Sequence, residues 1–224
     1  MMKEDRNVIR LKKPWPTKKV MEQIYAMKLW GVHTTPFYSG HGSHDNDLVE
    51  PYVNIISAFL DALNQPIVVC DLGCGDFNVG KDLVRFTKQY KAIDIVDDLV
   101  SYNKETFKDS NLEFICLDIV TDDLPSGDCV ILRQVLQHLS NYEIECIVRK
   151  LYKFKYVIVT EHLPDNNFIP NSDIISGQGI RLKKKSGVNL LAPPFNLKVK
   201  SNRCLLRLKS KRNRGVIVTT LYEL

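Results

Sequence analysis

The chain of 224 residues lacks the sequence patterns of membrane-spanning, secreted and disordered proteins. No apolar run reaches the roughly 18 to 20 residues that cross a bilayer, so we expect no membrane span. The amino terminus, Met-Met-Lys-Glu-Asp-Arg, has no apolar stretch after it, which argues against a secretory signal. With 44% apolar and 25% charged residues the composition is not that of a disordered chain. We expect a soluble globular protein, and one compact domain is the prior for this length.

The cysteines do not form the paired clusters of a structural zinc site. Cys70 and Cys74 have three residues between them, no second close pair follows, and the nearest histidine is far along the chain. Most of the six cysteines stand among apolar residues in predicted strands or helices, as buried free thiols do. We therefore expect no bound metal and a reducing, cytoplasmic location.

A glycine-rich turn is the most informative feature that is present. It follows an apolar run, residues 66–70, that predicts a buried strand, and it precedes residues 79–89, which predict a helix. Asp71 lies at the end of this strand, and Gly73 and Gly75 let a ligand lie against bare main chain. A dinucleotide fingerprint has a third glycine where Asn78 stands, and no Gly-Lys-Ser/Thr of a P-loop follows. The turn therefore predicts a binding site for a nucleotide-like cofactor, and its sequence is not that of a phosphate-binding loop.

Two further predicted strands also end in carboxylates. Residues 90–94 end in Asp94, about 20 residues after the turn, and residues 112–117 are followed by Asp118. Open α/β sheets bind ligands at the carboxyl ends of their strands, and one carboxylate there can accept hydrogen bonds from both ribose hydroxyls. The alternative for Asp94 is a surface acid in a turn, because two more aspartates follow it closely.

With Asp71-x-Gly73-x-Gly75, Asp94 and Asp118 in this order, the chain resembles class I S-adenosylmethionine-dependent methyltransferases. It further resembles a bacterial subgroup often found among surface-polysaccharide genes, over roughly residues 30 to 197. The motifs that carry this resemblance are Trp30-Gly31, Ser39-Gly-His-Gly-Ser43, Cys74-Gly-Asp-Phe77, Asp94-Ile-Val96, Leu117-Asp-Ile119, Arg133-Gln-Val-Leu-Gln-His-Leu-Ser140, Asn171-x-Asp173-Ile and Pro193-Pro-Phe195. Gln134 departs from the pattern, in which we expect an acid at this position.

The resemblance implies S-adenosylmethionine as the cofactor. Asp94 would bind the ribose, Asp118 would meet the adenine amino group, and Arg133 would hold the methionyl carboxylate. The full set of residues expected at the cofactor comprises Tyr38, Gly40, Ser43, Asp71, Gly73, Gly75, Asp94, Ile95, Asp118, Ile119 and Arg133.

The predicted fold is α/β: a Rossmann-like sheet of seven strands, mostly parallel with an antiparallel last strand, flanked by helices. Besides the strands already named, strands are expected at 128–132, 155–160, 203–209 and 215–222, and helices at 17–29, 47–63 and 141–152. We expect residues 1–46 to form an N-terminal helix and flap over the site and residues 47–224 to form the methyltransferase domain. Residues 164–197 are a long connection of a kind that is often functional.

Charge is unevenly distributed. Residues 181–214 contain twelve Lys and Arg and no Asp or Glu, and residues 1–20 are also basic, whereas the cofactor half is acidic. This pattern indicates either solvated faces or attraction for a phosphate-bearing partner: a nucleotide-linked sugar, a lipid phosphate or, last because no RNA-binding motif is present, RNA. Arg181 is the residue predicted to contact an anionic acceptor.

Methyl transfer to a hydroxyl requires that the acceptor and the methyl group be held in line, and a general base accelerates it. Histidine is suited to act as this base. His162 and His138 follow predicted strands at the reactive edge, and His41 and His44 lie in the flap. His162, His138 and His41 are the candidate bases, each with hydrogen bonding within the fold as the alternative. The preferred acceptor is a hydroxyl on a small sugar, a nucleotide-sugar or a similar phosphorylated molecule.

Three other functions stay open. A nicotinamide-dependent oxidoreductase is disfavoured by Asn78 and by the absence of a Tyr-x-x-x-Lys pair. An RNA methyltransferase would show steep salt dependence of binding. A catalytically silent relative that binds the cofactor within a partner complex would lack an open acceptor pocket.

Overall fold

A computed structural model describes residues 14–209 and 215–224. The sheet has the strand order β3-β2-β1-β4-β5-β7-β6. Its strands are Val68–Leu72 (β1), Gln89–Asp94 (β2), Leu112–Cys116 (β3), Cys129–Arg133 (β4), Tyr156–Leu163 (β5), Ser201–Lys209 (β6) and Val216–Glu223 (β7). The α-helices of the described residues are Thr17–Ala26 (α1), Asn46–Asp61 (α2), Asp97–Thr106 (α3) and Asn141–Leu151 (α4).

The directions of the strands confirm the predicted fold class. Strands β1 to β5 pair in parallel, whereas β7 runs antiparallel to both of its neighbours, β5 and β6. The strand order reverses between β1 and β4, and the loops that follow these two strands therefore diverge and leave a crevice between them. A ligand site is expected at this point of such a sheet.

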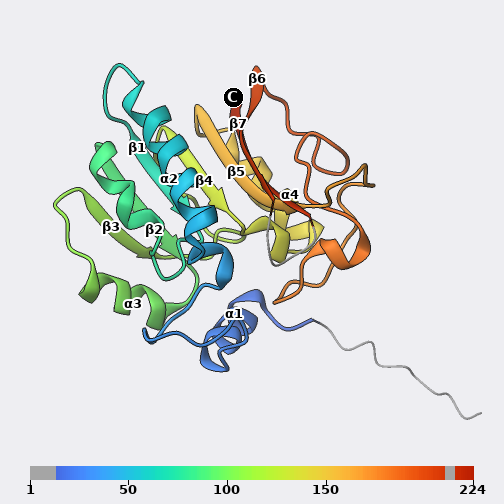
Figure 1. The fold of residues 1–224 in the computed structure, drawn as a ribbon, viewed down its shortest axis with the longest axis horizontal. Coiled ribbons are helices and arrows are strands. Elements are labelled where there is room, and N and C mark those ends of the chain that lie inside the picture. The colour runs from blue at the N-terminus through green and yellow to red at the C-terminus, as the bar shows by residue number, and fades with distance from the viewer. Residues whose placement is uncertain (1–13, 210–214) are drawn as a thin grey trace, which may run out of the picture.

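Alternating side chains of the strands build one apolar core on each face of the sheet. On one face, Tyr52, Ile56 and Leu60 of α2 pack in a cluster with Val69 and Ile131. On the other, four apolar residues of α4 pack in a cluster with strand residues whose side chains point the opposite way, such as Cys70 and Val130. Figure 1 shows α2 in front of the sheet. Among the described residues, no helix is long and apolar enough to cross a bilayer.

The described part of the flap, residues 14–46, lies at the edge where the parallel strands end. In Figure 1, α1 lies below this edge, next to α3. Met21 and Ile24 of α1 are buried in the same apolar cluster as Leu72 and Leu132 of the sheet. The flap is therefore packed on the domain that it covers, although the boundary at residue 46 stays a prediction. Residues 1–13 and the predicted basic turn at 210–214 lie outside the described residues.

The predicted helix at 79–89 is wrong. Two short 3-10 turns, Gly80–Asp82 and Val84–Phe86, occupy the connection to β2. Phe77 has a φ of 60° and is fully buried, and a Cβ on Gly80 would lie 2.4 Å from its ring. The chain therefore turns tightly around a buried ring, and this tertiary contact outweighs the apolar spacing that favoured a helix.

Two further expectations need correction. Helix α3 was not predicted, although Asp97 and Asp98 in its first turn and the buried Leu99, Val100 and Asn103 are typical of an amphipathic helix. Burial of the cysteines holds only in part, because Cys70 and Cys129 are buried whereas Cys116 and Cys204 are exposed.

Candidate functional site

A cavity of about 530 Å³ lies at the carboxyl ends of the parallel strands, between the sheet and the flap. It is lined by the loops after β1, β2, β3 and β4 and by residues of α1, α2 and the flap. Its volume is within the range of roughly 300 to 1,000 Å³ found for small-molecule sites. The structure thus places a cavity where the strand order reverses.

Both glycines of the turn after β1 are required by the geometry. Gly73 has a φ of +78° and a Cβ there would lie 2.5 Å from Val135 Cγ2. Gly75 has a φ of +58° and a Cβ there would lie 2.3 Å from Ser39 Oγ. Side chains at these positions would face both an unfavourable main-chain conformation and a steric clash. The turn therefore presents bare main chain to the cavity.

Asp94 is fixed at the end of β2 by the main chain around it. Its Oδ2 accepts a hydrogen bond from the Gly75 N–H at 3.0 Å, and its Oδ1 accepts one from the Val96 N–H at 3.2 Å. The side chain is 8% exposed, and burial raises the pKa of Asp94, against the effect of these hydrogen bonds. Each oxygen retains a lone pair, so the carboxylate can accept further hydrogen bonds from a ligand in the cavity.

The other two predicted carboxylates also line the cavity. Asp71 accepts a hydrogen bond from the Tyr90 hydroxyl at 2.9 Å, and burial raises the pKa of Asp71 to about 7. Asp118 follows β3, and its Oδ1 accepts a hydrogen bond from the Val120 N–H at 2.8 Å. Ile95 and Ile119, which follow Asp94 and Asp118, line the cavity as well. The structure thus brings the acids of three strands to one cavity.

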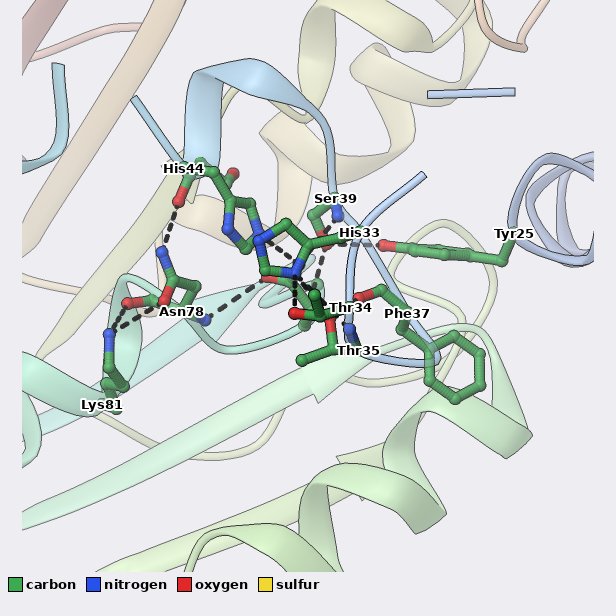
Figure 2. A network of polar contacts seen from close by, with 12 residues as sticks. Tyr25, His33, Thr34, Thr35, Phe37, Ser39, His44, Asn78 and Lys81 are labelled. Atoms are coloured by element: carbon green, nitrogen blue, oxygen red, sulfur yellow. Dashed lines mark hydrogen bonds and ion pairs between the residues drawn. The ribbon is translucent and has the colours of Figure 1, made fainter. Parts of the chain in front are cut away.

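Hydrogen bonds tie the flap to the glycine turn. The Ser39 N–H donates to Asp76 Oδ2 at 2.8 Å, and the Asp76 N–H donates back to Ser39 Oγ at 2.7 Å. Tyr25 contacts the same Ser39 hydroxyl at 2.9 Å, and Asn78 Nδ2 donates to the Ser43 carbonyl at 2.8 Å. Figure 2 shows Ser39 and Asn78 in this network. Asn78, which excluded a dinucleotide fingerprint, thus has a role in holding the flap.

Three predicted cofactor residues in the flap differ in their positions. Gly40 and Ser43 line the cavity, whereas Tyr38 is not among the lining residues. Its ring stacks on His33, with 5.4 Å between centroids, and lies 4.5 Å from the ring of His44. His44 Nε2 in turn lies 2.6 Å from Asp76 Oδ2. Tyr38 therefore belongs to an aromatic cluster outside the cavity.

Arg133 connects the end of β4 to the flap. It donates from Nη2 to the Gly42 carbonyl at 2.6 Å and from Nη1 to Ser43 Oγ at 3.2 Å. Its guanidinium lies 4.9 Å from the centroid of the Tyr52 ring, and it lines the cavity. The next residue, Gln134, lies against Gly42, where a Cβ would come within 2.1 Å of its Oε1.

The three candidate bases all line the cavity, in different settings. His138 Nδ1 lies 3.1 Å from the Gly177 carbonyl, and its Nε2 lies 3.3 Å from Gln137 Nε2, an atom that can only donate. Both ring nitrogens of His138 are thus engaged, and burial lowers its pKa to about 4. His41 Nε2 lies 2.8 Å from Asp45 in the flap. His162 is 7% exposed, and its main-chain N–H donates to Gln137 Oε1 at 3.1 Å.

Arg181, the residue predicted to contact the acceptor, is buried away from the cavity. It is 1% exposed and does not line the cavity. Its guanidinium donates to the carbonyls of Ser172, Leu136 and Leu139 and to Asn141 Oδ1, at 2.8 to 3.1 Å. These contacts join the 172–181 segment to the loop after β4, so the predicted contact with an anionic acceptor is at odds with its position.

Two buried polar residues of the site, Asp76 and Gln137, were not predicted to have a role. Asp76 joins the flap to the turn, and Gln137 joins His138 to His162. Asp76 stands inside a quoted motif, so its polar side chain beside Gly75 was the available signal. Within the part of the chain that the structure describes, no group of three His, Cys, Asp or Glu is arranged to hold a metal ion.

Comparisons with known proteins agree with this geometry. Residues 70–153 match the model of a family described as a methyltransferase domain. The N-methyltransferase NodS from Bradyrhizobium japonicum, in complex with S-adenosylhomocysteine, superposes with a TM-score of 0.64 at 10% identity, over 91% of this chain and 98% of that one. Magnesium protoporphyrin IX methyltransferase from Synechocystis, with bound S-adenosylmethionine, has a TM-score of 0.57 at 14% identity, over 95% of this chain and 100% of that one. Human N-acetylserotonin methyltransferase has a TM-score of 0.58 at 14% identity, over 93% of this chain and 60% of that one.

No curated protein matches the chain by sequence. At these identities the structural likeness shows the fold, which is that of the Rossmann-like methyltransferases. The family match adds that residues 70–153, which contain the glycine turn, Asp94, Asp118 and Arg133, are similar to a methyltransferase domain. Fold and family match together support S-adenosylmethionine as the cofactor.

Proposed function

We propose that this protein binds S-adenosylmethionine in the cavity and transfers its methyl group to a hydroxyl of a small acceptor. One observation carries the proposal. The bare main chain of Gly73 and Gly75 and the carboxylates of Asp71, Asp94 and Asp118 converge on one cavity at the point where the strand order reverses. The methyltransferase family match covers this same part of the chain.

The residues that line the cavity fit this cofactor. Asp94, held by two main-chain N–H groups, would accept hydrogen bonds from the ribose hydroxyls. Asp118 and Ile119 would meet the adenine, and the Gly73–Gly75 turn would leave room for the methionyl part. Gly40 and Ser43 would cover the cofactor from the flap, with Arg133 beside them as the cation for the methionyl carboxylate.

The bound cofactor would supply a methyl group on a sulfonium leaving group, and the protein would supply orientation and a base. Holding two reactants in line contributes about 7 to 11 kcal/mol in favourable cases. We propose His162 as the base, because it lines the cavity at the end of β5 and its main chain is fixed by Gln137. His138 has both ring nitrogens engaged and a pKa lowered to about 4, which suits a role in shaping the pocket.

A sugar acceptor and a place in surface-polysaccharide synthesis remain part of this proposal, supported by the motif resemblance alone. A cytoplasmic location stays a prediction in the same way. The phosphate-bearing acceptor was inferred from the basic segment 181–214. Of the arginines named as anion contacts, Arg133 lines the cavity and Arg181 does not.

Titration calorimetry with S-adenosylhomocysteine and with NAD tests the proposal. We expect S-adenosylhomocysteine to bind and NAD to give no heat. NAD binding without S-adenosylhomocysteine binding would favour an oxidoreductase, and binding of neither would refute a cofactor site. If S-adenosylhomocysteine binds and no acceptor in a panel of sugars is turned over, a catalytically silent subunit or an RNA acceptor becomes the better account.

A further inference from the structure

Part of the described cavity lining, from α1, the loop after β4 and the connection before residue 181, carries no carboxylate. We call it the acceptor compartment and define it by Met21, Leu29, Trp30, His138, Leu139 and Ile180, all of which line the cavity. They come from three segments: α1 with the residues after it, the loop after β4, and the connection before the Arg181–Lys184 turn.

Direct contacts join these segments into one wall. The rings of Trp30 and His138 lie 5.4 Å apart, and His138 Nδ1 lies 3.1 Å from the Gly177 carbonyl. Gln178 Nε2 donates to the Leu29 carbonyl at 2.6 Å. Trp30 is also held by an edge contact with Tyr25, at 5.2 Å between centroids. The compartment is therefore a built surface with a fixed aromatic ring.

No side chain that defines the compartment carries a charge at neutral pH. His138 stays neutral because burial lowers its pKa to about 4, and the other five are apolar. Among the described residues, four aspartates and three histidines line the cavity, and Arg133 is the one Lys or Arg in its lining. Arg133 already donates to Gly42 and Ser43. With Arg133 assigned to the methionyl carboxylate of the cofactor, an anionic acceptor group would find no other Lys or Arg in the described lining of the cavity.

Burying an anion without a partner costs several kcal/mol, more than the apolar contacts of a small ring return. An uncharged group with an apolar face, in contrast, gains from contact with Trp30 and Leu139. Hydroxyls on its other side can hydrogen bond with neutral amides nearby, such as Gln137 and Gln178, which also line the cavity.

We propose that the part of the acceptor that enters the cavity to be methylated is uncharged and lies with an apolar face on Trp30. This inference rests on the proposed function, and it narrows the acceptor: any phosphate would have to stay outside the cavity. A neutral sugar ring or an aromatic ring meets this description.

A pair of fluorescent probes with the same rings tests the charge preference directly. N-phenyl-1-naphthylamine is neutral, and 8-anilinonaphthalene-1-sulfonate carries one negative charge. Each is titrated into protein saturated with S-adenosylhomocysteine, and only the part of the signal removed by Trp30→Ala is compared, because the basic outer surface binds the sulfonate independently. We expect the neutral probe to bind at least about tenfold more tightly.

Two variants complete the experiment. Trp15→Ala, at a tryptophan that is 62% exposed and does not line the cavity, should leave binding of the neutral probe unchanged. Leu29→Lys, at a residue that is 39% exposed, should shift the preference toward the sulfonate even if Trp30→Ala destabilises the fold. Equal or tighter Trp30-dependent binding of the sulfonate, no binding of the neutral probe, or no effect of Leu29→Lys would overturn the inference.

The calorimetric test of the cofactor is independent of these probes. If S-adenosylhomocysteine does not bind, the proposed function fails, and the probe titrations on the protein alone still decide whether the compartment prefers a neutral ring. If the cofactor binds and the probes show a preference for the anion, the inference fails while the proposed function stands.

Discussion

Asp94 is the single residue on which binding of the cofactor should depend most. Changing it to Asn keeps the size of the side chain and removes its charge, and with it one of two strong acceptors for the ribose. A hydrogen bond to a charged group contributes roughly 1.5 to 3 kcal/mol. We therefore expect Asp94→Asn to weaken S-adenosylhomocysteine binding by about 10- to 100-fold in calorimetry.

Asp98 provides the matched control for this change. It is an exposed acid four residues later in the first turn of α3, and it does not line the cavity. Asp98→Asn should leave the affinity unchanged. Equal affinities in the two variants would mean that Asp94 does not bind the ribose of the cofactor.

Replacement of His162 tests the base. In His162→Gln the main-chain N–H that donates to Gln137 remains, so the loss is confined to the ring. With an acceptor that supports turnover, we expect kcat to fall by about 10² to 10⁴-fold while affinity for S-adenosylhomocysteine is retained. His138→Asn should instead raise KM for the acceptor, because His138 packs on Trp30. A larger fall of kcat in the His138 variant would reverse the two roles.

At the scale of residues, the sequence predicted those site positions that depend only on local order along the chain. Asp94 and Asp118 line the cavity, as an acid that follows a strand of a parallel sheet must lie at its carboxyl edge. Tyr38 and Arg181 do not line it, because contacts with other side chains and main-chain carbonyls set their positions. Gln137 was missed for the same reason: its partner, His162, is 25 residues away.

At the scale of elements, the contact between the glycine turn and the flap is the feature to test. A Cβ at position 75 would lie 2.3 Å from Ser39 Oγ. An alanine there would also have to adopt a left-handed main-chain conformation, which costs about 1 to 2 kcal/mol. We expect Gly75→Ala to displace the flap, to weaken S-adenosylhomocysteine binding at least about tenfold and to speed protease cleavage within residues 33–45.

Gly179→Ala is the matched control, because nothing lies within 4 Å of a Cβ at that position. It should behave as the unchanged protein in both measurements. If Gly75→Ala binds the cofactor normally and its flap is no more sensitive to protease, then the contact with Ser39 does not hold the flap in place.

The elements themselves were predictable where apolar spacing and burial agree. All seven strands were placed within a few residues. Runs of apolar residues between polar turns mark the buried strands, and alternating apolar and charged residues mark the mostly exposed β6. The connection at 79–89 was misjudged because the burial of Phe77 sets its path, and no local pattern reports this. The helix α3 was missed although its first turn and its buried residues fit the expected spacing.

At the scale of the whole molecule, Arg181 joins segments that are distant in the sequence. Arg181→Met removes its bonds to the Ser172, Leu136 and Leu139 carbonyls and leaves these acceptors buried. Unsatisfied buried groups of this kind cost about 1 to 3 kcal/mol each before relaxation, so we expect the free energy of unfolding in urea to fall by about 2 to 4 kcal/mol.

Arg207→Met is the control, because Arg207 is exposed and its ion pair with Asp165 is long, at 3.7 Å. It should change stability by less than about 1 kcal/mol. A stable Arg181→Met protein with a raised KM for an anionic acceptor would instead restore the role that the sequence predicted for Arg181.

Stability of the whole fold should also depend on pH through Glu161, which is buried behind the cavity wall. Its Oε1 accepts a hydrogen bond from the Leu136 N–H at 3.2 Å, and burial raises the pKa of Glu161 to about 8. The pKa of Asp71 is raised to about 7 in the same way, and that of His138 is lowered to about 4. A raised carboxyl pKa means that the folded state holds a proton that the unfolded state has lost, so stability falls as pH rises toward the folded pKa.

His138 acts in the opposite direction only below about pH 6.5, where the unfolded imidazole becomes protonated. Between about pH 6.5 and 8, of these three groups only the carboxyls of Glu161 and Asp71 change the stability. We expect the free energy of unfolding to fall by about 1 kcal/mol or more over this range. In Glu161→Gln, which retains an acceptor for the Leu136 N–H, this fall should largely disappear. Urea unfolding at the two pH values measures it, and an equal fall in both proteins would show that Glu161 is already ionised in the folded state at pH 6.5.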